Sequence, residues 1–463
     1  MNKNSIDITN FLKKFPNSLN SEESKSRFDH IWRTDHELLC KGVIFPKKTE
    51  EVSEILKFCY ENNQEVVVHG GLTNLVGGTK VNPDQLVISL EKMDRINDID
   101  NETRTICVEA GAILENVIDE VEKFNLFLPL NFGAKGSAQA GGIVSTNAGG
   151  LRVFRYGMTR NWVVGLEAVF PDGSVYSNLK TIIKDNAGID LKHLFIGSEG
   201  VLGVVTKIVF RLVEMKNTRL TAIISINSFE NVLKSLRFLD KNIGDSLTGF
   251  ELMWKNTFDV MVGDDSPYKS PFNSVSKYVV FIEVLNNENY DSEYNRVLDV
   301  LVEMLNINFI DDSVIIDSQA EQSNFWKIRE DVSILETKAP YNQHFDISIP
   351  QSKVQIFLDE ILSDLEKNRE IINVFPFGHI ADGNIHLIIG KATDSLELTD
   401  EINTIVYGSL SSFNGSISGE HGVGVDKKHY LHYTRNSNEI ELMKNIKSLI
   451  DKKNILNPSR IFN

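Results

Sequence analysis

The chain is 463 residues long, enough for two or three domains, because a single hydrophobic core rarely serves more than roughly 250 to 300 residues. Hydrophobic residues at 41% and charged residues at 24% are typical of a soluble globular protein. The net charge of −16 argues against nucleic acid as a partner and gives no reason to expect an anionic membrane surface as one.

The N-terminus and the cysteines indicate the protein's setting. The N-terminal residues lack the apolar run and the cleavage site of a signal peptide, and no stretch approaches the roughly 18 to 20 apolar residues of a membrane-spanning helix. We therefore expect a cytoplasmic protein. Cys40, Cys59 and Cys107 are widely spaced and cannot supply the about four thiolates of an iron–sulfur cluster. Any electrons that the protein collects must leave through a separate partner.

The first part of the chain reads as a polar arm followed by alternating strands and helices. Residues 1–36 are rich in Asn, Ser and Lys, and we expect a loosely packed arm there, with a helix near residues 6–14. An apolar stretch over residues 42–45, helical spacing from Val52 to Tyr60 and a strand over residues 65–68 follow.

A glycine-rich loop, HGGLTNLVGG from His69 to Gly78, comes after this strand. Its glycines let backbone amides approach a ligand closely, which makes an anion nest suited to a diphosphate. The loop leads into a strand over residues 86–90 rather than a helix, so it is neither a Walker loop nor the dinucleotide fingerprint of a Rossmann unit. By itself the loop is equally compatible with a plain glycine hairpin.

Residues 128–157, LPLNFGAKGSAQAGGIVSTNAGGLRVFRYG, are dominated by small side chains. A segment with so little bulk can hardly form a core of its own, so we expect it to lie against a large planar ligand. The chain continues through an apolar stretch over residues 162–170 to the sequence FIGSEGVLGVVT over residues 195–206.

From about residue 214 the pattern becomes that of an α+β domain. Residues 220–226 and 278–284 are strand-like, and residues 229–239 have helical spacing. Further on, Trp326 and Arg329 are three residues apart on a predicted helix and share a face. There the guanidinium could hold a substrate carboxylate or form a surface cation–π pair.

Histidines gather in two glycine-containing motifs. The sequence FPFGHIADGNIHLII over residues 375–389 predicts a hairpin, with His379 closing one strand and His386 opening the next. The later motif SGEHGVG holds Glu420 and His421 between glycines. His379, His386 and Glu420 are a sufficient ligand set for a divalent metal, and His421 could then move a proton. The alternative is that these are surface turns whose histidines cap strands.

Together and in this order, HGGLTNLVGG, VEAGAILENV, STNAGGLRVFRYGM, FIGSEGVLGVVT and the two histidine motifs resemble the FAD-linked oxidase family of the vanillyl-alcohol-oxidase type fold. Within it the chain resembles the D-2-hydroxyacid dehydrogenases, which include D-lactate, glycolate and D-2-hydroxyglutarate dehydrogenases. The resemblance covers about residues 37–463. It implies an α+β fold with a two-subdomain FAD-binding domain of vanillyl-alcohol-oxidase/PCMH type, an α+β substrate (cap) domain and a C-terminal helical segment.

The pattern shifts and the resemblance together predict four parts of the chain. Residues 1–36 form an N-terminal arm and residues 37–213 the FAD-binding domain. Residues 214–415 form the substrate domain that carries the metal hairpin. Residues 416–463 form a C-terminal segment that contains the GEHG motif and returns to the flavin.

The resemblance also implies which residues hold FAD. The first glycine loop would bind the diphosphate through Gly70, Gly71, Thr73, Asn74, Leu75 and Gly78. The rest of the cofactor would be lined by Gly133, Ser137, Gly142, Thr146, Asn147, Gly149, Tyr156, Glu199, Gly200, Val205 and Asn457. Asn74 stands where many relatives have glycine. Covalent attachment of the flavin is not implied, because His69 precedes the glycine pair instead of following it.

The implied activity is oxidation of a D-2-hydroxy acid to the 2-oxo acid. In the family the W-x-x-R-E motif supplies the arginine that grips the α-carboxylate, which favours Arg329. The further substrate-binding residues that the resemblance implies are Ser333, His344 and His421. A metal, Zn²⁺ or Mn²⁺, on the ligand set above would make the substrate hydroxyl more acidic. His421 would take the hydroxyl proton while hydride passes to the flavin.

Two positions favour a substrate like D-lactate. In relatives that act on D-2-hydroxyglutarate, a lysine and an asparagine help hold the distal carboxylate, and these places are His344 and Ile388 here. An isoleucine cannot hydrogen-bond a carboxylate, and desolvating that charge beside it would cost roughly 1 to 3 kcal/mol. D-2-hydroxyglutarate is the alternative substrate.

Two rival functions make different predictions. A non-catalytic FAD-binding subunit, as occurs within glycolate oxidase assemblies, would need neither the histidine hairpin nor GEHG. An oxygen-using aryl-alcohol oxidase of the same fold would have no metal triad. For the dehydrogenase we expect a quinone, an electron-transfer flavoprotein or an iron–sulfur protein as the electron acceptor, and a homodimer is a further expectation.

Overall fold

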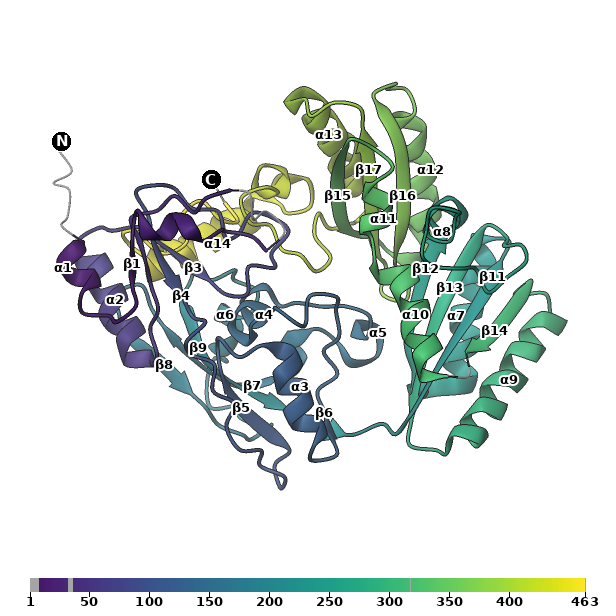
Figure 1. Cartoon of the computed structure of the whole chain (residues 1–463), viewed down its shortest axis with the longest axis horizontal. Helices are drawn as coiled ribbons and strands as arrows, with labels where there is room; N and C mark the ends of the chain where they lie inside the picture. The colour runs from purple at the N-terminus through teal and green to yellow at the C-terminus, as the bar shows by residue number, and fades with distance from the viewer. Residues whose placement is uncertain (1–7, 32–35, 317, 463) are drawn as a thin grey trace. The chain divides into compact units, whose positions relative to one another are not determined.

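A computed structural model describes residues 8–31, 36–316 and 318–462, and the chain divides into two compact units (Figure 1). The first unit comprises Met1–Gly149, Met158–Glu214 and Glu420–Asn463, and the second comprises Gly150–Gly157 and Met215–Gly419. The short insertion Gly150–Gly157 comes from the glycine-rich part of the sequence. The predicted domain boundaries after residues 36, 213 and 415 stay predictions.

The N-terminal arm packs on the first unit. Helix α1 (Thr9–Leu12) buries Phe11, whose ring stacks on Phe58 of α2 (Thr49–Glu61) with 3.7 Å between centroids. Ile8, Leu12 and Phe15 are also buried, so the expectation of a loosely packed arm is wrong for residues 8–15. Residues 1–7 and 32–35, which include the start of the helix predicted near residues 6–14, lie outside the described residues.

A four-stranded sheet in order β1-β2-β4-β3 lies at the start of the first unit. Strands β2 (Gly42–Ile44), β4 (Leu86–Ser89) and β3 (Val66–His69) are parallel, and β1 (Leu19–Asn20) adds an antiparallel edge. Helix α2 is the crossover between β2 and β3, which confirms the alternation predicted from residue 42 to residue 90.

A second four-stranded sheet is antiparallel throughout, in order β5-β9-β7-β8. Its strands are β5 (Thr105–Glu109), β9 (Val204–Arg211), β7 (Val163–Val169) and β8 (Val175–Asn178). The first unit also contains α3 (Leu114–Glu122), β6 (Leu126–Phe127), α4 (Ala140–Thr146), α6 (Lys192–Phe195), β10 (Val213–Glu214) and α14 (Ser437–Ile450).

The second unit is built on a seven-stranded antiparallel sheet in order β14-β11-β13-β12-β16-β17-β15. Its strands are β11 (Thr218–Ile226), β12 (Leu247–Trp254), β13 (Tyr278–Asn286), β14 (Asp312–Ile316), β15 (Tyr341–Ser348), β16 (Ile371–His379) and β17 (Asn384–Lys391). Its helices are α5 (Val153–Tyr156), α7 (Phe229–Ile243), α8 (Lys255–Met261), α9 (Tyr290–Asn306), α10 (Gln319–Glu330), α11 (Ser333–Glu336), α12 (Val354–Leu365) and α13 (Leu396–Phe413). The elements predicted over 220–226, 229–239 and 278–284 and the hairpin over 375–389 are confirmed.

The two faces of this sheet have different partners. On one face, Phe345 of β15 packs against Tyr407 of α13 with 5.1 Å between ring centroids. On the other face, Phe281 of β13 and Phe377 of β16 share a buried core with Trp326 of α10. Because alternate residues of a strand point to opposite faces, His379 and Phe377 are on the same face. The candidate histidines therefore lie on the face that α10 covers.

Two arginines hold the insertion Gly150–Gly157 in the second unit. Arg152 donates from Nε and Nη2 to the two carboxylate oxygens of Glu283, at 2.8 and 3.0 Å. Glu283 is fully buried and is also 3.1 Å from Nε of Arg219. Arg155 donates to the backbone carbonyls of Leu247 and Gly244, at 3.0 Å each.

Replacing Arg152 with methionine should destabilise the second unit by about 3 kcal/mol, the lower end for a broken buried ion pair, because Arg219 still compensates part of the charge. Burial by itself raises the pKa of Glu283, but Arg152 and Arg219 outweigh it and lower the pKa to about 2. The wild type should therefore hold this stability above about pH 4.5 and lose it as the pH falls toward 2, and the variant should show a shallower loss. Urea unfolding at several pH values measures both effects.

Lys255→Met is the matched control, since Lys255 pairs with Asp259 on the surface of α8 with both side chains 48% exposed. It should leave the transition unchanged. Equal effects of the two substitutions would contradict the role of the buried pair.

Candidate active site

The two glycine-rich segments pack backbone to backbone in the first unit. A Cβ on Gly71 would collide with the Ser137 carbonyl, whereas a Cβ on Gly142 would meet no described atom within 4 Å. Between them, the buried Oε1 of Gln139 has no hydrogen-bond partner among the residues that the structure describes. An open wall of glycine beside an unsatisfied buried acceptor fits a ligand that lies along it. Gln139 was not predicted as a site residue.

Asn74 closes the first glycine loop with its own side chain. Its Oδ1 accepts hydrogen bonds from the backbone amides of Val76 at 3.0 Å and Gly78 at 2.7 Å. Asn74 therefore organises the turn of this loop. Thr73 and Leu75 lie on the same loop, and Leu75 is exposed.

Glu199 and Asn457 join distant segments of the first unit. The carboxylate of Glu199 accepts from the backbone amides of Val423 and Gly424, both at 2.7 Å. Burial raises the pKa of Glu199, and these two hydrogen bonds oppose the shift. Asn457 accepts from the amide of Val68 at 2.9 Å and donates to the carbonyl of Glu199 at 3.2 Å.

The remaining residues predicted to line the cofactor are distributed as follows. Thr146 donates back to the Gly142 carbonyl at 3.0 Å, and Asn147 ends α4 in the left-handed conformation. Val205 lies in β9, and Tyr156 belongs to the insertion in the second unit. Gly133, Gly149 and Gly200 lie on loops of the first unit.

Arg329 and His379 meet on one buried carboxylate in the second unit. Nε and Nη2 of Arg329 are each 2.9 Å from Oε2 of Glu251, and Nδ1 of His379 is 2.5 Å from Oε1. Burial would raise the pKa of Glu251, but His379 and Arg329 outweigh it and lower the pKa, so the carboxylate is charged. Glu251 was missed; its only signal was a single acid within the apolar strand FELMW.

The surface alternative for the Trp326 and Arg329 pair is wrong. Trp326 is 4% exposed and its indole donates to Thr221 at 3.0 Å, while Arg329 is 8% exposed. The Arg329 guanidinium lies 4.7 Å from the ring centroid of Phe377. The cation–π contact thus exists, but with another ring and inside the unit.

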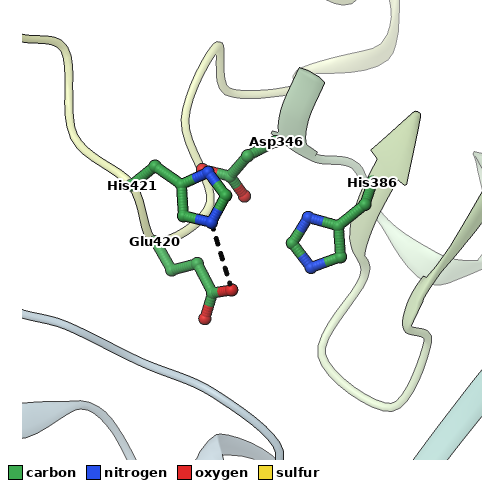
Figure 2. A group of neighbouring side chains, drawn as sticks. All are labelled: Asp346, His386, Glu420 and His421. Carbon is green, nitrogen blue, oxygen red and sulfur yellow. Dashed lines mark ion pairs between the residues drawn. The ribbon is translucent and has the colours of Figure 1, made fainter. Parts of the chain in front are cut away.

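The predicted hairpin brings the imidazoles of His379 and His386 together, with ring centroids 5.3 Å apart. Ligand atoms of Asp346, His386, Glu420 and His421 lie within 4.8 Å of one another (Figure 2). Two of the three predicted metal ligands, His386 and Glu420, are in this group. His379 is outside it, and Asp346 was not predicted.

Asp346 fixes the turn that comes directly before Glu420. Its Oδ1 accepts from Asn384 at 2.7 Å, and its Oδ2 accepts from the Ser418 hydroxyl and the Gly419 amide at 3.1 Å each. Imidazole and carboxylate donors in such a group fit Zn²⁺ or Mn²⁺. The carboxylate of Asp346 is largely occupied by these hydrogen bonds.

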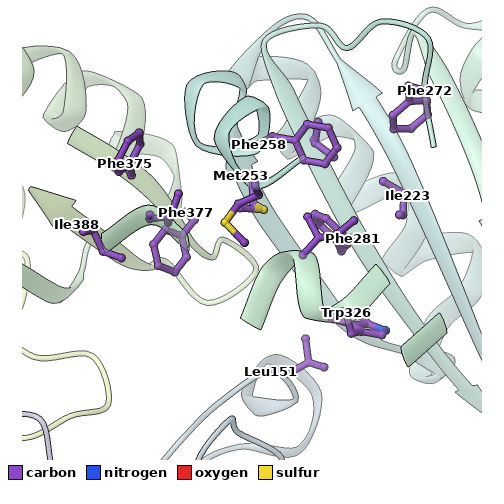
Figure 3. Packing of buried hydrophobic residues seen from close by; sticks show 14 of the residues in the cluster. Leu151, Ile223, Met253, Phe258, Phe272, Phe281, Trp326, Phe375, Phe377 and Ile388 are labelled. Carbon is purple, nitrogen blue, oxygen red and sulfur yellow. The ribbon is translucent and has the colours of Figure 1, made fainter. Parts of the chain in front are cut away.

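Ser333 and His344 have partners on the protein. The Ser333 hydroxyl donates to Asp331 at 2.5 Å, and Nε2 of His344 is 3.0 Å from Oε1 of Glu336. His344 is paired with Ile388 in the register of β15 and β17. Ile388 is 2% exposed and belongs to the same apolar cluster as Phe375 and Phe377 (Figure 3).

The part of the chain that the structure describes contains no helix long and apolar enough to cross a membrane. Cys40 and Cys59 are buried and Cys107 is half-buried, and all three are free thiols.

Two family models match the chain. Residues 40–177 match a FAD binding domain, and residues 215–461 match the C-terminal domain of FAD linked oxidases.

Curated proteins are similar over almost the whole chain. A protein of Oryza sativa subsp. japonica named "Probable D-2-hydroxyglutarate dehydrogenase, mitochondrial" is 37% identical over 99% of this chain and 82% of its own length. The mitochondrial D-2-hydroxyglutarate dehydrogenase of Arabidopsis thaliana is 35% identical over 97% of this chain and 80% of its own. A mitochondrial protein of Schizosaccharomyces pombe named "Putative D-lactate dehydrogenase" is 34% identical over 93% of this chain and 83% of its own length.

Solved structures show the same fold at low identity. An alkyldihydroxyacetonephosphate synthase aligns with a TM-score of 0.75 and 15% identity, over 98% of this chain and 84% of that one. A p-cresol methylhydroxylase with bound substrate aligns with a TM-score of 0.73 and 15% identity, over 96% of this chain and 93% of that one. The predicted fold class is confirmed.

The names of the curated relatives contradict the expectation of a cytoplasmic location. The relatives from Oryza sativa, Arabidopsis thaliana and Schizosaccharomyces pombe are all named as mitochondrial proteins. The expectation rested on the lack of a signal peptide and of a membrane span, and neither feature distinguishes the cytoplasm from an organelle.

Proposed function

We propose that this chain prefers a substrate with one carboxylate, such as D-lactate, and uses a divalent metal. The chain belongs to the family of FAD-linked oxidases and is an FAD-dependent dehydrogenase of D-2-hydroxy acids. The observation that carries the proposal is the arrangement on one face of the second unit. There Glu251 pairs with both Arg329 and His379, and the imidazole ring centroids of His379 and His386 are 5.3 Å apart.

Arg329 would grip the α-carboxylate of the substrate. Nε and one N–H of Nη2 face Glu251, and this leaves the other N–H of Nη2 and the two of Nη1 to donate to a substrate oxygen. Because Arg329 is 8% exposed and stacks on Phe377, its side chain has little freedom to leave that orientation. A fixed guanidinium sets the position of the substrate carbon that is oxidised.

His421 would take the proton of the substrate hydroxyl. Its Nε2 is 3.6 Å from Oε1 of Glu420, and its side chain is 27% exposed, so a ligand can reach it. FAD, when bound along the glycine loops, accepts the hydride. His379, His386 and Glu420 would hold Zn²⁺ or Mn²⁺, which would make the hydroxyl more acidic.

The preference for a small substrate is supported by two side chains that lack the means to hold a second carboxylate. Ile388 is buried in the apolar cluster, and His344 is already paired with Glu336, whose negative charge would repel a distal carboxylate. D-2-hydroxyglutarate is the second candidate, because relatives at 35 to 37% identity bear that name.

The ratio of kcat/KM for D-lactate and D-2-hydroxyglutarate, measured with a dye acceptor, tests this choice. We expect D-lactate to be favoured, and the double variant His344→Lys with Ile388→Asn to shift the ratio toward the dicarboxylate by about tenfold or more. L-lactate is the control for the stereochemistry. A wild-type preference of about tenfold or more for D-2-hydroxyglutarate would overturn the assignment.

We also propose that the electrons pass to a separate quinone, electron-transfer flavoprotein or iron–sulfur protein. The three cysteines lie far apart in sequence and are fewer than the about four thiolates that hold an iron–sulfur cluster, which supports a separate acceptor. A homodimer stays a prediction.

A further inference from the structure

Glu251 is a buried carboxylate to which the proposed function assigns no role. It lies on β12 and is 1% exposed. Its two oxygens are divided between two partners: Oε2 faces Nε and Nη2 of Arg329, and Oε1 faces Nδ1 of His379. Arg329 comes from α10 and His379 from β16, so one carboxylate connects three separate elements of the second unit.

A buried carboxylate is costly unless it is paired on both sides, and here both partners are residues with proposed roles in the reaction. We propose that Glu251 is a positioning residue, which fixes the guanidinium of Arg329 and the imidazole of His379 relative to each other. The inference rests on the proposed function, in which Arg329 holds the substrate carboxylate and His379 holds a metal.

The physical effect on each partner is different. For His379, the carboxylate at Nδ1 selects the tautomer whose Nε2 presents a lone pair, and it orients the ring, as an acid behind a metal-binding histidine does. For Arg329, the carboxylate engages Nε and Nη2, and it thereby determines the direction of the remaining donors. Loss of Glu251 should therefore weaken metal binding and substrate binding together.

The chain provides a matched control in Glu283. This residue is also a fully buried glutamate on the same face of the same sheet, since Glu251 pairs with Phe281 and Gly249 pairs with Glu283 in the register of β12 and β13. Its arginine partners, Arg152 and Arg219, have no proposed role in the reaction. The two glutamates thus separate a positioning role from the general requirement for a buried ion pair.

The experiment compares Glu251→Gln and Glu283→Gln in the full-length FAD-loaded protein. For Glu251→Gln we expect metal affinity, measured by Zn²⁺ competition against a chromophoric chelator, to fall by roughly 10- to 100-fold. At saturating Zn²⁺ we expect KM for the D-2-hydroxy acid to rise by about tenfold or more, with flavin absorbance unchanged. Glu283→Gln should change stability but leave metal affinity and KM within about twofold of the wild type.

Two outcomes would overturn the inference: metal affinity and KM of Glu251→Gln both within about twofold of the wild type, or equal losses in the two glutamine variants. If Glu251→Gln does not fold, Glu251→Asp replaces it. The shorter acid should lose at least one of its two partners, and wild-type values of both constants in Glu251→Asp would overturn the inference equally. Failure of the proposed function is separate, because the wild type would then bind no Zn²⁺ or turn over no D-2-hydroxy acid.

Discussion

His421→Asn should lower turnover by roughly 10²- to 10⁴-fold, the usual range for a lost general base, while FAD and metal remain bound. Asparagine keeps the size and hydrogen-bonding capacity of the side chain but cannot take a proton. Flavin reduction in a single turnover, followed by stopped-flow absorbance, measures the step directly and separates it from reoxidation by the acceptor. KM should change much less than kcat, because Arg329 rather than His421 provides most of the proposed binding.

The control is His432→Asn, a histidine that is exposed on the surface after the GEHG motif. Its Nδ1 contacts the carbonyl of His429 at 2.9 Å, and no role in the reaction is proposed for it. This variant should reduce its flavin at the wild-type rate. If His421→Asn also reduces its flavin within a few-fold of the wild type, the base is another residue.

Local features of the site could be predicted from the sequence. The hairpin over residues 375–389 is determined by two apolar runs and an Ala-Asp-Gly-Asn turn, and these signals act over a few residues. The helix that carries Trp326 and Arg329 could be predicted for the same reason. The order of the glycine motifs identified the family, because each loop is weak evidence alone and the series is specific.

The partners of these residues could not be predicted, since they depend on strand pairing between distant parts of the chain. Glu251 is 128 residues from His379, and the register of β12 with β16 decides that they meet. Arg152 and Glu283 are 131 residues apart, and nothing in the small-residue segment around Arg152 indicates a buried carboxylate partner. The same holds for Phe11, whose stacking on Phe58 explains why the polar composition of the arm was misleading.

Asp346 is a candidate ligand that residue type alone did not suggest. The sequence suggested two histidines and one glutamate, but it gave no reason to place an aspartate from β15 beside them. The register does: Asp346 is opposite His386 in the pairing of β15 with β17. The predicted set with His379 and the group that contains Asp346 and His421 share His386 and Glu420.

His386→Ala should therefore lose the metal whichever set is correct, with metal affinity lowered by more than roughly 100-fold and FAD retained. His386 is 8% exposed in the middle of a paired strand, and alanine removes the imidazole without disturbing the backbone hydrogen bonds of β17. Metal content after dialysis against EDTA, with absorbance of the flavin as the reference for folded protein, measures the loss. Turnover should fall with the metal and should not be restored by added FAD.

Two companion variants decide between the ligand sets. His379→Ala should lose the metal if His379 is a ligand, whereas Asp346→Asn should then keep most of it, because asparagine retains an acceptor for the Gly419 turn. The reverse result would replace His379 by Asp346 in the site and leave His379 as the partner of Glu251 alone. If His386→Ala keeps a full equivalent of metal and full activity after EDTA, neither set holds the metal, and the four side chains in Figure 2 are neighbours that do not bind it.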